Sequence, residues 1–70
     1  MKNKKFFAVG AHLSNGATLL HWKEERDTVV VLALYQNEIV TWLLDSAGDP
    51  YSGRYHKDLL TAVEDFKARS

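Results

Sequence analysis

The sequence of 70 residues has no cysteine, one proline, four glycines and no net charge. Without cysteine the chain can form neither a disulfide nor a thiolate metal site. Nine Lys and Arg balance nine Asp and Glu, which excludes a protein that depends on bulk attraction to nucleic acid or to an anionic membrane. No apolar run approaches the ~18–20 residues that a transmembrane helix needs, so we expect no membrane anchor.

The first residues imitate a secretory signal peptide, because three lysines precede an apolar run. That run, 6–13, is short and contains Gly10 and His12, which suit the hydrophobic region of a signal peptide poorly. We therefore predict a cytoplasmic protein.

The length and the apolar content predict one folded domain over residues 1–70. Hydrophobic residues make up 46% of the chain, too many for a disordered segment. A chain of this size buries only about 60–65% of its unfolded surface, so its stability is marginal unless something is added. Since disulfides are excluded, we expect the association of two copies to supply the missing stability, and we predict a homodimer.

Turn signals divide the chain into short apolar segments. Asn15-Gly16 is a strong hairpin signal, and Gln36-Asn37 and Asp49-Pro50 mark further turns. A two-residue loop at Asn15-Gly16 pairs His12 with Leu19. The predicted strands are about 5–13, 17–23, 28–35, 38–45 and 51–55.

The last segment has the period of a helix, predicted over about 57–68. Leu59, Val63 and Phe66 recur at the spacing of one helical face. Asp58 falls in the first turn and Lys67 and Arg69 fall in the last, as the helix dipole favours, but no residue is an obvious N-cap. The predicted fold is α+β: an antiparallel meander of four or five strands with one C-terminal helix packed on one face.

The two central strands carry apolar residues on both faces. In 38–45, Ile39 and Leu43 flank Thr41 on the face opposite Val40 and Trp42. One helix covers only one face, so sheet curvature, a second copy or a foreign partner must close the other. We predict a dimer or partner interface on these strands, formed by Val29, Val31, Ile39, Thr41 and Leu43.

The segment after Pro50 offers a second candidate interface. Tyr51, Arg54, Tyr55 and His56 have the composition that is favoured at interface hot spots. The alternative is that one tyrosine packs beneath the helix.

No constellation predicts catalysis or a bound cofactor. His12, His21 and His56 lack metal-ligand spacing, and we interpret His12 and His21 as polar residues on the wet face of an edge hairpin. The serines lie in loops without a nucleophile-elbow context, and the glycines are too sparse for a phosphate loop. We predict no enzyme, no metal and no cofactor.

Charge is unevenly distributed along the chain, since residues 1–23 carry four lysines and no acid. Lysines beside an aromatic ring can bind single-stranded nucleic acid, although lysines also protect an edge strand from aggregation. The alternative function is therefore nucleic-acid binding by the first hairpin, with the candidate contacts Lys2, Lys4, Lys5, Trp22 and Lys23.

Three stretches, 34–42, 53–55 and 62–66, resemble small uncharacterised proteins of phages and other mobile elements. The resemblance covers the second half of the chain and assigns no residue a role. It implies an accessory protein that binds a host or defence protein, in some cases as an anti-CRISPR-like inhibitor. The function we predict is a small non-enzymatic protein-interaction module that acts by binding or occluding a partner protein.

Overall fold

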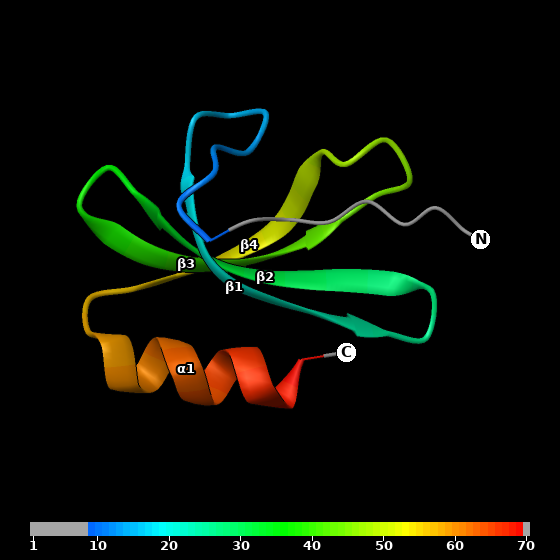
Figure 1. The fold of residues 1–70 in the computed structure, drawn as a ribbon. Helices are drawn as coiled ribbons and strands as arrows, with labels where there is room; N and C mark the ends of the chain where they lie inside the picture. Colours follow the sequence, from blue (N-terminus) through cyan, green and yellow to red (C-terminus); the bar gives the residue numbers. More distant parts are fainter. Residues whose placement is uncertain (1–8, 70) are drawn as a thin grey trace.

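The computed structural model describes residues 9–69, which form one antiparallel sheet and one helix (Figure 1). The strands pair in sequence order, β1-β2-β3-β4, so the predicted α+β meander is confirmed. The helix α1 follows the last strand and lies across one face of the sheet. The elements are β1 (Thr18–Glu25), β2 (Thr28–Tyr35), β3 (Glu38–Leu44), β4 (Pro50–His56) and α1 (Leu59–Ala68).

Short turns join the strands and fix their register. Gln36 and Asn37 both have positive φ, at 50° and 68°, which is the signature of the type I′ turn that matches strand twist. The turn between β3 and β4 is longer, and the Asp45 carboxylate accepts hydrogen bonds from the backbone N–H groups of Ala47 and Asp49. These turns place each strand beside its sequence neighbour.

The predicted first hairpin differs from the observed one. Residues 5–8 of the predicted strand lie outside the described residues, and 9–13 form no strand apart from one bridge between His12 and Thr18. Gly16 has a φ of 92°, but Asn15 does not have positive φ, so a type I′ turn is excluded. Leu13 instead donates its N–H to the carbonyl of Ala17 across a three-residue loop. The register is therefore shifted by one residue, and His12 does not pair with Leu19.

The helix begins later than predicted, because Asp58 is its N-cap rather than part of its first turn. The Asp58 carboxylate accepts hydrogen bonds from the backbone N–H of Thr61 at 2.9 Å and from its hydroxyl at 2.6 Å. These bonds lower the pKa of Asp58, since they favour the charged form. Phe66 is buried as predicted, whereas Leu59 is 54% exposed.

The helix covers the face of β3 that carries Ile39, Thr41 and Leu43. These residues are aligned with Leu34, Leu32 and Val30 of β2, and Val30, Leu32, Ala62 and Phe66 form the buried cluster beneath α1. Ile39 and Leu43, two of the predicted interface residues, are therefore covered by the amphipathic helix and do not lie on an open face.

The opposite face holds a second core. Its buried residues are Ala17, Leu19, Val31, Ala33, Val40, Trp42 and Leu44, and Leu13, Trp22, Val29 and Tyr35 pack against them. Bulges between Leu19 and His21 in β1 and opposite Trp42 in β4 bend the sheet, which is strongly coiled in Figure 1. Coiling and the segment before β1 thus bury much of the face that the helix leaves open.

Candidate functional site

The last strand, β4, forms an exposed edge of the sheet. Its five central residues, 51–55, are all exposed, whereas the middle of β3 beside it is buried. Among residues 9–69, β4 pairs with β3 alone, so its outer backbone groups face no other described strand. An edge of this kind is the part of a sheet most open to a partner chain.

A bulge in β4 sends its two tyrosines to different faces. Ser52, with a φ of 56°, adds one residue opposite Trp42. Tyr51 is therefore aligned with Leu43 on the helix side, and Tyr55 is aligned with Val40 on the other side. Simple alternation would place both tyrosines on one face, whereas the bulge places them on opposite faces. Neither tyrosine packs beneath the helix, since they are 48% and 54% exposed.

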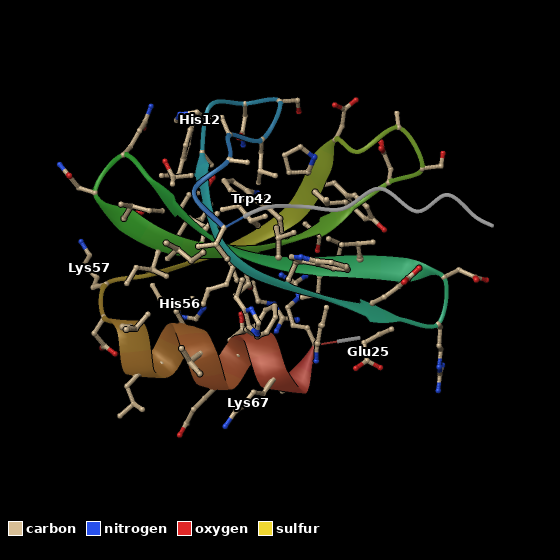
Figure 2. All side chains as sticks on the ribbon, viewed as in Figure 1. His12, Glu25, Trp42, His56, Lys57 and Lys67 are labelled. Carbon is tan, nitrogen blue, oxygen red and sulfur yellow. The ribbon has the colours of Figure 1, made fainter. Side chains whose placement is uncertain are left out.

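The side chain of Asp65 connects α1 to β3 and β4. One carboxylate oxygen, Oδ2, accepts from the Thr41 hydroxyl at 2.6 Å and lies 3.0 Å from Nε2 of His56. The other, Oδ1, accepts from Nη1 of Arg54 at 2.7 Å. Figure 2 shows His56 directed toward the helix from the end of β4. The carboxylate is thus held by three side chains from two strands.

Arg69, just beyond the helix, completes this polar cluster, which we call the Asp65 cluster (Thr41, Ser52, Arg54, His56, Asp65 and Arg69). Its Nη1 donates to both the backbone carbonyl and the hydroxyl of Thr41, each at 3.0 Å. Its Nη2 donates to the hydroxyl of Ser52 at 3.0 Å. Arg69 is buried, and within the described part of the chain no buried side-chain N or O atom lacks a hydrogen-bond partner.

The cluster changes the acidity of its charged groups. Burial alone would raise the pKa of Asp65, but the hydrogen bonds from Thr41, His56 and Arg54 outweigh it and lower the pKa to about 2. Burial lowers the pKa of the Arg69 guanidinium, and the nearby charge of Arg54 lowers it further. The cluster contains two guanidinium groups and one carboxylate, a formal excess of one positive charge, and its Arg54 side chain is 59% exposed.

The structure does not bring the five predicted interface residues together. Ile39, Thr41 and Leu43 lie under α1, where Thr41 is fully buried, and Val31 and Val29 lie on the opposite face. In contrast, Tyr51, Arg54, Tyr55 and His56 all lie on β4, where Arg54 and His56 meet at Asp65.

The predicted nucleic-acid contacts are only partly described. Lys2, Lys4 and Lys5 lie outside the described residues. Trp22 and Lys23 are adjacent in β1 and point to opposite faces, since Trp22 packs against the second core and Lys23 lies 5.4 Å over the Phe66 ring. Lys23 also donates to the carbonyl of Lys67 at 2.9 Å, so it does not form one platform with Trp22.

The histidines are separated. Nδ1 of His12 lies 3.3 Å from the carbonyl oxygen of Gly16, whereas the His21 ring packs on Phe66 with centroids 5.3 Å apart. No group of His, Asp and Glu within residues 9–69 has the geometry of a metal site. The described helix is also too short to cross a membrane.

Sequence reasoning missed Asp65 and Arg69 as members of the site. Both share one helical face with the buried Ala62 and Phe66, at spacings of three and four residues. An acid and an arginine on the apolar face of a helix are a signal of a buried polar cluster, whereas Arg69 was interpreted only as a residue that complements the helix dipole.

No protein-family model matches the chain, and neither a curated protein nor a solved structure is detectably similar to it.

Proposed function

We propose that this domain is a non-enzymatic interaction module that binds a partner protein through the β4 surface, defined as Tyr51, Arg54, Tyr55 and His56. The observation that carries the proposal is the exposure of two tyrosines and an arginine on an edge strand. Tyrosine and arginine are enriched at interface hot spots because they offer large contact area and directional hydrogen bonds.

The Asp65 cluster supports this function by holding the surface in one conformation. Arg54 is fixed at one end by its 2.7 Å bond to Asp65, and Tyr55 packs edge-on against Trp42 with ring centroids 6.1 Å apart. Side chains that are already ordered lose less conformational entropy on binding, which improves affinity without new contacts.

The mode of action that we propose is occlusion of the partner. The described domain is small, about 36 × 24 × 18 Å, and its exposed strand lies at one side of the sheet. A rigid body of this size that is bound across a functional surface blocks access to it. The resemblance to accessory proteins of phages is consistent with an inhibitor of this kind.

A site-specific crosslinking experiment tests the proposal. A photoreactive phenylalanine analogue replaces Tyr55 in one variant and Glu64, an exposed residue on the outer side of α1, in the control. We expect a discrete crosslinked protein from position 55 in the source cells, identified by mass spectrometry, and none of that species from position 64. Equal products from both positions, or none from position 55, would contradict the proposal.

A further inference from the structure

We propose that the partner contributes an extended segment that lies along β4 and bears an acidic side chain that binds Arg54. This inference rests on the proposed function and adds to it the chemistry of the partner. It is carried by the free donors of Arg54, by the local excess of positive charge and by the open strand edge.

Arg54 has hydrogen-bonding capacity left for a ligand. Within residues 9–69 its side chain donates only from Nη1, to Asp65, while the side chain as a whole is 59% exposed. A guanidinium has five N–H donors, and its planar fork matches a carboxylate. Asp65 therefore orients Arg54 without saturating it.

The charge around Arg54 favours one anionic group. Arg69 is buried and its guanidinium bonds Thr41 and Ser52 rather than a carboxylate, so Asp65, which pairs with Arg54, leaves the cluster with a formal excess of one positive charge. Burial lowers the pKa of the Arg69 guanidinium, and the positive charge of Arg54 lowers it further, which agrees with this excess. A carboxylate beside Arg54 would bring the local charge to balance.

The same region disfavours a polyanion such as nucleic acid. Asp49 immediately precedes β4, and at the other end Lys57 is paired with Glu38 while Asp58 follows it with a further negative charge. A chain of phosphates along the strand would meet a like charge at each end, whereas a single carboxylate at Arg54 would not. The positive charge is therefore local, and a protein segment with one acid fits it better.

The exposed edge supplies the extended geometry. A partner strand can add to an open sheet edge by main-chain hydrogen bonds, with side chains providing specificity. The bulge at Ser52 interrupts the edge, so the regular part available is 53–56, with Arg54 and Tyr55 on its two faces. An extended segment of four or five residues matches this length.

Two short peptides test the inference. Acetyl-Thr-Val-Glu-Val-Thr-amide favours an extended conformation and carries one acid, and its twin has Gln in place of Glu. Each is titrated into the 15N-labelled 70-residue chain, and amide shifts in β4 are followed by NMR. We expect saturable shifts at 53–56 and an affinity about two- to fivefold higher for the Glu peptide, the range of a partly exposed ion pair.

Variants separate the role of Arg54 from general charge. Arg54→Gln removes the guanidinium, so the two peptides should then bind with equal affinity. Arg54→Lys keeps the charge and should retain part of the preference for the Glu peptide. Lys57→Gln is the matched control, because Lys57 is an exposed cation of the same surface whose Nζ lies 3.7 Å from Glu38. It should leave the preference unchanged, and thermal melts confirm that each variant is folded.

Several outcomes overturn the inference. Equal binding of the two peptides to the wild type, or loss of the preference in Lys57→Gln, removes Arg54 as the acid receptor. Tighter binding of oligo-dT at the same amides indicates nucleic acid, and concentration-dependent shifts without peptide indicate a second copy. If neither peptide binds but position 55 still crosslinks a partner, only the acidic segment is refuted. If the crosslink is absent, the proposed function itself is refuted.

Discussion

Gly53 lies directly against the indole of Trp42, and a Cβ atom at this glycine would come within 2.5 Å of Nε1. Gly53 does not have positive φ, so the close approach rather than the backbone conformation requires glycine here. The contact joins the exposed strand β4 to a side chain that is 5% exposed in the second core. The position of the β4 surface therefore depends on the absence of one methyl group.

The first prediction follows from this contact. Gly53→Ala should lower the free energy of unfolding by about 1–3 kcal/mol, the cost of forcing an extra carbon into a packed site. Urea denaturation followed by tryptophan fluorescence measures the change. Ser46→Ala, in the exposed loop before β4, is the control and should leave the midpoint unaltered. Wild-type stability in Gly53→Ala would show that β4 can move away from Trp42.

The second prediction concerns acid. The pKa of Asp65 is about 2 in the folded protein and near 3.8 in the unfolded chain. The stabilisation that the ionised carboxylate gives the folded state is therefore present above pH 4 and is lost as the pH falls toward 2. The shift corresponds to about 2 kcal/mol. Asp65→Asn should be less stable than the wild type at neutral pH, with the difference narrowing in acid. Glu64→Gln should keep the wild-type profile, and an Asp65→Asn profile parallel to the wild type would contradict the assignment.

The third prediction concerns the packing of the helix. Phe66→Ala should cost about 3–5 kcal/mol, because it removes a buried ring from the cluster beneath α1. Leu60→Ala, at a position that is 71% exposed, should change the melting temperature little. Similar losses in both variants would mean that the helix does not pack by its Ala62 and Phe66 face.

The fourth prediction distinguishes the two candidate interfaces. Ile39→Lys combined with Leu43→Glu should unfold the protein, because both side chains pack against the helix cluster and a charge there lacks a partner. Tyr51→Ala, combined with the photoreactive residue at position 55, should remain folded and lose partner crosslinking. A folded, well-dispersed NMR spectrum for the first double variant would restore Ile39 and Leu43 as candidates for the interface.

The strands and their order could be predicted from the sequence because turns and period-two patterns are local signals. The face covered by the helix could not, since β2 and β3 are apolar on both faces and either face could accept it. The Thr41 hydroxyl favours this face, because it is buried and its hydrogen-bond partners, Asp65 and Arg69, come from the helix and the residue after it. Thr41 was interpreted as an interface residue because its partner lies 24 positions away.

The Asp65 cluster could be predicted only in part, for a related reason. The sequence grouped His56 and Arg54 in the segment after Pro50, but the carboxylate that both side chains contact belongs to Asp65 on the helix. The sequence interpretation did not include the bulge at Ser52, for which the adjacent Gly53 is the one local signal. Sequence patterns report single elements, whereas this site forms where three elements meet.

The meander also determines the order in which the protein can fold. Each strand pairs with its neighbour through a short turn, so the sheet can form by local steps with little loop-closure entropy. The bond between Thr41 and Asp65 spans 24 positions, and the site that holds the carboxylate is complete only when β3 and β4 have paired. We expect these contacts to be absent from the folding transition state. Substitutions in the Asp65 cluster should therefore accelerate unfolding and leave the folding rate nearly unchanged.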